Sequence, residues 1–212
     1  MLKIWGRSNS LNVQKAMWTV GELAIAHERV DAGGRFGGLD RPDYLRMNPN
    51  ARVPTIDDGG TIVWESNAVV RYLSARYGEG KLWDADPGKR AQADQWMDWM
   101  QTTLAPDFYD LFWNVVRLPD ARKNPEAAAE AARRLRGHYA VVERQLGDKP
   151  FMVGERLSMA DIVIGATLYR YYEMPIDHPG LGGIHAWYQR LKDRPAYRRH
   201  VMVSFEALRG NG

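Results

Sequence analysis

The sequence predicts two domains, a mixed α/β domain followed by an all-helical domain. Three observations support this fold class. Short apolar runs alternate with helix-type periodicity up to residue 77, a polar segment bearing glycines and a proline follows, and beyond it the strand-type pattern disappears. The chain has 212 residues, 45% of them hydrophobic, which suffices for one large or two small cores. We therefore predict an α/β domain at 1–77, a linker at 78–87 and an all-α domain at 88–212.

The first domain is predicted to contain four strands. Strands are expected at 2–5 and 27–31, and two more form a hairpin around a turn at Asp58-Gly59-Gly60. A helix at 11–24 places Val13, Ala16, Met17 and Val20 on one face, a single helical turn is expected at 44–47, and a last helix at 65–77. The glycine-rich stretch 32–38 is predicted to be an irregular loop. The order β-α-β-(α)-β-β-α is that of a thioredoxin-like domain.

The second domain is predicted to consist of helices only. A long helix spans 87 to about 116 with a kink at Pro106, and further helices are expected at 126–146, 160–172 and 184–192. Ser158 and Asp161 stand three residues apart before an apolar run, which is the spacing of a helix capping box. We assign this pair a structural role.

The composition excludes several classes of function. The chain has no cysteine, so it has no disulfide, no thiolate metal site and no cysteine nucleophile, and we expect no metal. A net charge of +3 mildly favours anionic ligands. The arginines of 133–136 lack interleaved aromatic residues, so we expect a solvated helix face and no nucleic-acid partner. There is no apolar run of membrane-spanning length, and the N-terminus predicts a strand rather than a signal peptide, so we expect no membrane partner and a cytoplasmic location.

The most informative motif is a strand, a turn, a strand and a helix start between residues 52 and 68. The last helix of the first domain begins at Glu65 and Ser66. Helix N-termini carry unpaired N–H groups and a partial positive charge, so this end predicts a small pocket for a carboxylate. An acid beside it would suit an ammonium group on the same ligand. A free amino acid head group carries both charges.

The pattern V-P-x-[IL] at Val53-Pro54-Thr55-Ile56, followed by E-S-x-A-[IV] from Glu65, resembles the glutathione-binding half of the glutathione S-transferase family. The two-domain layout resembles that family over nearly the whole chain, in its cytosolic, serine-type form. The resemblance implies glutathione as co-substrate, a homodimer, and a cis bond before Pro54, with main-chain groups of Val53 pairing with the cysteinyl part. Arg52 matches a basic position near the glycine carboxylate. Arg35 is an alternative, although a solvated loop charge is the simpler interpretation.

Glutathione chemistry requires a thiolate, and the loop before the first helix is where its donor is expected. Ser10, with the residues up to Lys15, resembles the S-x-x-[VCA]-x-[RK] arrangement in which the serine donates to the sulfur. Asn12 stands where proline is common and is itself a possible donor, and Asn9 is another. The structural alternative is that Ser10 only caps the helix.

The second substrate is expected between the domains, against the first helix of the all-α domain. That stretch is rich in aromatic residues and methionine, and we name Phe112, Trp113 and Arg117 as lining residues, although such spacing is also typical of a core. The predicted function is conjugation of the glutathione thiolate to a small apolar electrophile. The alternatives are a glutathione-dependent disulfide reductase or peroxidase, and a non-catalytic carrier or interaction module of the same fold.

Overall fold

The computed structural model describes residues 1–178 and 180–211 of the chain. These residues form two compact units. The first comprises Met1–Ala85 and Pro195–Val203, and the second comprises the described residues of 86–194 and 204–211. The first boundary therefore falls inside the segment that the sequence suggests as a linker, and a short piece near the C-terminus belongs with the first unit.

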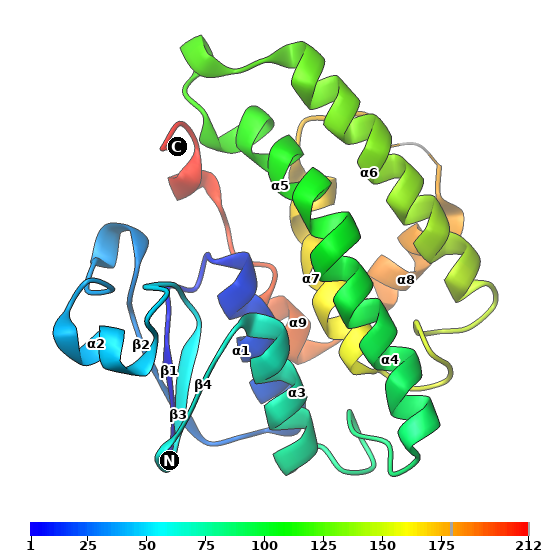
Figure 1. Ribbon diagram of the computed structural model, residues 1–212. Coiled ribbons are helices and arrows are strands. Elements are labelled where there is room, and N and C mark those ends of the chain that lie inside the picture. The colour runs from blue at the N-terminus through cyan, green and yellow to red at the C-terminus, as the bar shows by residue number, and fades with distance from the viewer. Residues whose placement is uncertain (179, 212) are drawn as a thin grey trace. The chain divides into compact units, whose positions relative to one another are not determined.

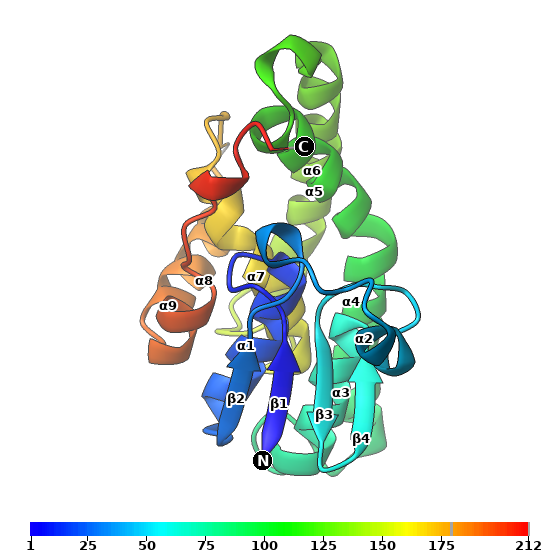
Figure 2. The ribbon, with the colours of Figure 1, turned by 90° about the vertical axis from the view of Figure 1, so that its left-hand side faces the viewer.

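The first unit is built on a four-stranded mixed sheet. Its strands lie in the order β2-β1-β3-β4, with β1 parallel to β2, and with β3 antiparallel to both β1 and β4 (Figure 2). The strands are β1 (Leu2–Trp5), β2 (His27–Val30), β3 (Thr55–Asp58) and β4 (Thr61–Trp64). The predicted hairpin is thus confirmed, with Gly59 and Gly60 at positive φ in its turn.

Two helices, α1 (Leu11–Leu23) and α3 (Ser66–Tyr77), pack on each other and against one face of the sheet, while α2 (Pro42–Met47) lies on the other side (Figure 1). The core between them is apolar because alternate strand residues and one face of each helix point inward. It contains Leu2, Ile4, Val13, Ala16, Met17, Val20, Ile56, Val69 and Leu73. This is the predicted thioredoxin-like arrangement.

A short helix from the end of the chain completes the first unit. Helix α9 (Pro195–His200) packs on α1, where the rings of Tyr197 and Trp18 meet edge to face with centroids 4.7 Å apart. Gly21 permits the approach, since a Cβ there would lie 2.9 Å from atoms of Ala196 and His200. In the sequence this helix directly follows the all-α domain, and no local pattern separates the two.

The second unit is all-helical, as predicted. Helix α4 (Pro87–Trp99) continues through a π-helical turn (Met100–Leu104) into α5 (Ala105–Phe112) and a second π-helical turn (Trp113–Arg117). Pro106 lies just after the first π-helical turn, so the regular bonding that its missing N–H would break is already interrupted there. The remaining helices are α6 (Pro125–Leu146), α7 (Met159–Glu173) and α8 (Gly182–Lys192), with short 3-10 turns at Asp120–Arg122 and Glu206–Leu208.

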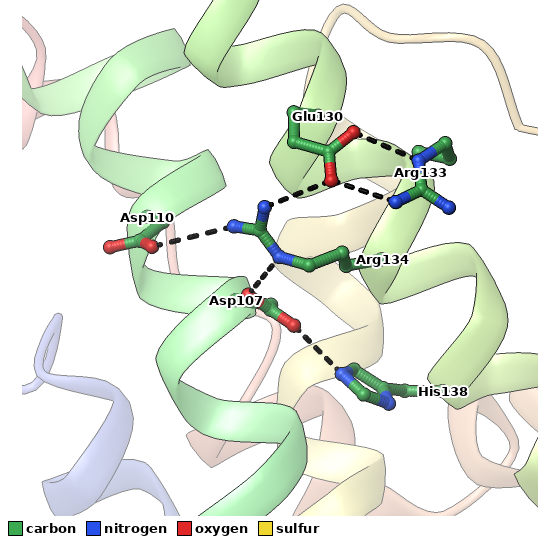
Figure 3. Close-up of polar contacts among 6 residues, drawn as sticks. All are labelled: Asp107, Asp110, Glu130, Arg133, Arg134 and His138. Carbon is green, nitrogen blue, oxygen red and sulfur yellow. Dashed lines mark hydrogen bonds and ion pairs between the residues drawn. The ribbon is translucent and has the colours of Figure 1, made fainter.

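The basic stretch of α6 lies beside acidic residues of α5 (Figure 3). The Arg134 guanidinium bonds Asp107 at 2.7 Å and Glu130 at 3.2 Å, and Arg133 bonds Glu130 at 2.7 Å. His138 also reaches Asp107, with its Nε2 atom 2.8 Å from the carboxylate. These arginines are therefore largely compensated within the helical unit, in agreement with the expectation of a helix face.

The predicted capping box is present at the start of α7. Asp161 is fully buried and accepts hydrogen bonds from the Ser158 N–H at 2.8 Å and from the Ser158 hydroxyl at 2.6 Å. It also accepts from the Met152 N–H at 2.9 Å and from the Trp187 indole N–H at 3.2 Å. The cap thus joins α7 to α8 and to the preceding loop. Burial raises the pKa of Asp161 to about 6, against the opposite effect of these hydrogen bonds.

Candidate active site

The N-termini of α1 and α3 meet in the first unit. The Ser66 hydroxyl, on the first residue of α3, donates to the Asn12 side-chain oxygen, on the second residue of α1, at 3.2 Å. The two residues are 54 positions apart in the sequence. The contact therefore brings together the loop predicted to activate a thiol and the motif predicted to bind an amino acid head group.

Ser10 occupies the N-cap position of α1. Its backbone is extended, with φ −91° and ψ 125°, its side chain makes no capping hydrogen bond, and the residue is 9% exposed. The Ser10 carbonyl accepts the first helical bond, from the Gln14 N–H at 2.9 Å. The Gln14 side chain also donates to the Ser8 carbonyl at 3.2 Å and holds the loop. The Ser10 hydroxyl is thus not used to cap the helix, which leaves it available to a ligand.

Glu65 is the N-cap residue of α3, and not its first helical residue as the sequence suggested. It is exposed, has φ +67° and ψ 117°, and its side chain does not cap the helix. A non-glycine residue at positive φ carries backbone strain, which is common at ligand sites. The following residues are buried, with Ser66 4% exposed and Asn67 7% exposed. The exposed carboxylate and the helix N-terminus therefore occupy adjacent positions.

The peptide bond between Val53 and Pro54 is cis, as expected from the resemblance. The segment before it is held through the Arg52 carbonyl, which accepts from the Tyr44 hydroxyl at 2.6 Å and from the Asn48 amide at 2.9 Å. Both side chains also bond the Thr55 hydroxyl, at 2.8 and 3.0 Å. Helix α2 thus fixes the backbone of this segment, a role that the sequence analysis had not assigned.

Gly6 is a second residue whose role only the structure reveals. A Cβ atom there would lie 2.4 Å from a methyl group of Val13 and 3.3 Å from the Cβ of Val53. Only glycine fits, because it has no side chain and because its φ is +154°. Gly6 therefore lets the loop before α1 approach the cis segment closely. Its position immediately after a strand is the sequence signal that could have identified it.

Arg52 and Arg35 both have exposed side chains. The Arg35 guanidinium lies over the Phe36 ring, 4.8 Å from its centroid. This cation–π contact occupies one face of the guanidinium. The role of Arg52 toward the glycine carboxylate stays a prediction.

Lys15, the last residue of the predicted thiol motif, is fully buried on α1. Its Nζ atom donates to the Asn67 side-chain oxygen at 3.5 Å, a long hydrogen bond. Burial lowers the pKa of Lys15 to about 7, while the negative charge of Glu65 acts in the opposite direction. The sequence indicated no role for this residue, because the spacing of apolar residues along α1 does not show that a lysine points inward.

The residues named for the second substrate lie in the helical unit at different depths. Phe112 is 3% exposed and packs between Phe108 and Phe205, with ring centroids 6.1 and 5.4 Å away. Trp113 is 40% exposed, and the Arg117 guanidinium stacks over its ring at 4.6 Å. Phe112 is thus part of an aromatic core, whereas Trp113 is partly exposed and pairs with Arg117. Their role as lining stays a prediction.

A cavity of about 410 Å³ in the first unit does not coincide with this site. It is lined by Ser8, Met17, His27, Arg29, Arg199, His200 and Val203. Within residues 1–178 and 180–211, no group of three or more potential metal ligands is found. Over the same residues, no helix is both long enough and apolar enough to cross a bilayer.

The first unit thus has a thioredoxin-like arrangement with a cis peptide bond before Pro54 and two adjoining helix N-termini, and an all-helical unit follows it in the chain. Comparison with known proteins identifies the family to which this arrangement belongs. Residues 1–75 match the glutathione S-transferase N-terminal domain model, and residues 125–190 match the C-terminal domain model. The chain therefore belongs to the glutathione S-transferase family, and as such it is an enzyme of the glutathione S-transferase type.

The chain resembles individual members over almost its full length. It is 35% identical to glutathione S-transferase GstB of Escherichia coli over 205 residues, covering 96% of this chain and 99% of the relative. A theta class glutathione S-transferase of Xanthomonas axonopodis pv. citri, solved with glutathione bound, superposes with a TM-score of 0.92 at 45% identity, covering 96% and 98% of the two chains. The Bombyx mori transferase BmGSTD1 gives a TM-score of 0.87 at 25% identity, covering 98% and 95%.

Proposed function

We propose that the protein conjugates the thiolate of glutathione to a small apolar electrophile. The observation that carries this proposal is the contact between Ser66 and Asn12, which places the start of α3 beside the start of α1. One helix end is suited to the γ-glutamyl group and the other to the sulfur. The bound tripeptide in the similar Xanthomonas enzyme supports the same ligand for this chain.

Each part of glutathione has a proposed partner in the first unit. The Ser66 hydroxyl and the N-terminus of α3 bind the glutamyl carboxylate, and Glu65 binds the glutamyl ammonium. Main-chain groups of Val53, held by the cis bond to Pro54, pair with the cysteinyl part. Arg52 reaches the glycine carboxylate.

The sulfur lies at the N-terminus of α1, where Ser10 donates its hydroxyl hydrogen to the thiolate. A free thiol has a pKa of about 8.5, so only a few per cent is ionised at neutral pH. A hydrogen bond to a charged group contributes about 1.5 to 3 kcal/mol and a helix end about 0.3 to 1 kcal/mol. At about 1.4 kcal/mol per pKa unit, together they lower the thiol pKa by about one to two units.

Conjugation then forms a carbon–sulfur bond. The thiol proton passes to solvent, the thiolate attacks the electrophilic carbon, and a leaving group such as chloride departs. Trp113 and Arg117, with Phe112 behind them, are the proposed lining for the apolar electrophile. We further propose a cytoplasmic homodimer, and light scattering tests the dimer.

The alternative chemistry is disulfide or peroxide reduction by the same bound thiolate. A chain without cysteine cannot form its own mixed disulfide, so a second glutathione would have to resolve a glutathionyl product. Conjugation needs one tripeptide and an apolar surface. The third class, a non-catalytic carrier, is disfavoured because Pro54, Glu65 and Ser66 would then have no ligand to hold.

The test compares kcat/KM for a chloronitrobenzene with kcat/KM for a hydroxyethyl disulfide, at a fixed glutathione concentration. This ratio measures differential transition-state stabilisation. We expect conjugation to be the faster reaction, and Ser10→Ala to slow it. Disulfide reduction that exceeds conjugation by about a hundredfold would show that the reductase is the better description.

A further inference from the structure

The cavity in the first unit has no part in the chemistry described so far. Its lining comes from strand β2, the loop before α1, helix α1 itself, and helix α9 with the residues that follow it. The described residues that line it include none of the residues proposed to bind glutathione. Its volume of about 410 Å³ is in the range of sites for small molecules.

Basic side chains dominate the wall of this cavity. His27 and Arg29 come from β2, and Arg199 and His200 come from α9. No acid is among the lining residues, all of which the structure describes. The positive charges of Arg199, His27 and Arg29 each act on His200, so the four groups are close enough to interact. An anion placed among them would relieve this mutual repulsion.

The two arginines of the cavity differ in how far they are compensated. The Arg29 guanidinium donates to the Gly6 carbonyl at 2.7 Å and pairs with Asp31, which does not line the cavity. Within residues 1–178 and 180–211, Arg199 makes no hydrogen bond and no ion pair. A guanidinium presents its N–H donors in a fork that matches the oxygens of a carboxylate or phosphate. Arg199 therefore has donors available to a ligand.

The other lining residues are apolar or carry a hydroxyl. Met17 of α1 is buried in the core of the first unit, and Val203 follows α9. Ser8 adds an exposed hydroxyl from the loop before α1. An inorganic ion would leave the apolar part of the lining in contact with water. An anionic group attached to an apolar body therefore fits this lining better.

We propose that this cavity binds a small organic anion that carries a carboxylate or phosphate group. Arg29, Arg199 and His200 hold the anionic group. Met17 and Val203 contact the apolar part of the same molecule. Because α9 supplies two of the four basic side chains, the packing of this helix on α1 creates the site. The inference goes beyond the proposed function and does not depend on it.

A simpler reason for basic residues on α9 is the helix dipole. Positive side chains in the last turn of a helix interact favourably with its C-terminus, and Arg198, Arg199 and His200 all lie there. That explanation treats Arg198 and Arg199 alike. The proposed site distinguishes them, because Arg199 lines the cavity and Arg198 does not. The two neighbouring arginines, both exposed, are therefore a matched pair for the test.

The experiment titrates the protein with phenyl phosphate and with phenylacetate, at neutral pH in a phosphate-free buffer, and follows the histidine ring resonances by NMR. Of the five histidines, His27 and His200 line the cavity, whereas His138, His178 and His185 belong to the second unit. We expect the resonances of the two cavity histidines to shift and to saturate, while the other three stay in place. The affinities of the two probes show whether the site prefers phosphate or carboxylate.

Variants and ligand controls assign the contacts. Arg199→Gln should weaken binding of both probes by about tenfold or more, because it removes hydrogen bonds to a charged group. Arg198→Gln removes the same charge one residue earlier and should change affinity by less than about twofold, because salt screens a charge outside the site. Ser66→Ala should leave binding of the probes unchanged. Both 2-phenylethanol, which lacks the charge, and inorganic phosphate, which lacks the apolar body, should bind more weakly than the probes.

The wild-type titration keeps the test decisive if a variant fails to fold. Probe binding that leaves the His27 and His200 resonances in place would overturn the inference. Equal losses of affinity in Arg198→Gln and Arg199→Gln would also overturn it, because the probes would then respond only to overall charge. Binding that is lost in Ser66→Ala would place the anion at the start of α3 instead. Equal binding of inorganic phosphate and phenyl phosphate would contradict the apolar part of the site.

Discussion

Glu65 has two properties that do not favour the stability of the folded protein. Its φ of +67° lies in a region that favours glycine, and its exposed carboxylate makes no capping bond to α3. Holding a non-glycine residue there costs about 1 kcal/mol or more. Because its carboxylate is exposed and does not cap the helix, we explain the retention of this residue by the ligand proposed above.

Replacing Glu65 should therefore separate stability from binding. We expect Glu65→Gly to weaken glutathione binding by about ten- to a hundredfold, since one contact to a charged group contributes about 1.5 to 3 kcal/mol. Its unfolding midpoint should not fall, because glycine relieves the strain. Ser66→Ala should weaken binding similarly.

Calorimetric titration and chemical denaturation measure the two quantities. Glu79→Ala, which removes an exposed acid just beyond α3, is the control and should leave affinity unchanged. Wild-type affinity in both Glu65→Gly and Ser66→Ala would remove the basis for a glutamyl pocket at this helix end.

The lowered pKa of Lys15 also predicts how the stability of the protein depends on pH. Its pKa is about 7 in the folded protein and 10.5 in the reference state, so between these values the unfolded chain binds more protons. Stability should therefore rise with pH in this window, by up to about 1.4 kcal/mol per unit from this residue alone.

Subtracting the profile of Lys15→Met from that of wild type isolates this contribution from other titrating groups. Urea denaturation at several pH values between about 7 and 9.5 provides both profiles. Parallel profiles for the two proteins would mean that Lys15 keeps an ordinary pKa.

At the scale of elements, the start of α7 is a junction rather than a simple cap. Asp161 accepts from Ser158, from the Met152 N–H and from Trp187 on α8. Removing the carboxylate leaves these buried donors without their acceptor, at about 1 to 3 kcal/mol for each. The loss should thus exceed the value of about 1 kcal/mol that a cap alone would give.

Asp161→Ala should consequently lower the free energy of unfolding by about 3 kcal/mol or more, as measured by urea denaturation. Asp148→Ala, at an exposed position after α6, is the matched control and should change it by less than about 0.5 kcal/mol. A denaturation midpoint unchanged in Asp161→Ala would show that this network does not stabilise the helical unit.

The sequence was sufficient for local structure and insufficient for contacts between distant segments. Strands and helices were located because their periodicities of 2 and 3.6 are properties of short windows. The bond between Ser66 and Asn12 spans 54 residues, and the contact of Lys15 with Asn67 spans 52. Such contacts depend on how α1 and α3 pack, which no local pattern encodes.

At the scale of the whole molecule, the same distinction explains which residues the sequence predicts. The sequence indicated the residues of the glutathione motif because they form a contiguous pattern that resembles a family. It missed Gly6, Tyr44 and Asn48, which lie against or hold the segment at the cis bond. It also left α9 with the helical domain, because only the packing of Tyr197 on Trp18 places that helix with the first unit.

The most direct test of the proposed chemistry is the ultraviolet absorbance of the thiolate in the glutathione complex, followed against pH. Wild-type protein should show a bound thiol pKa about one to two units below the free value of about 8.5. Ser10→Ala should return it toward that value while keeping glutathione affinity, and Asn12→Ala should weaken affinity through Ser66 with little change in pKa. A shift that follows Asn12 and not Ser10 would identify Asn12 as the donor, and a bound thiol that titrates at its free value in wild-type protein would contradict activation of the thiol at this helix end.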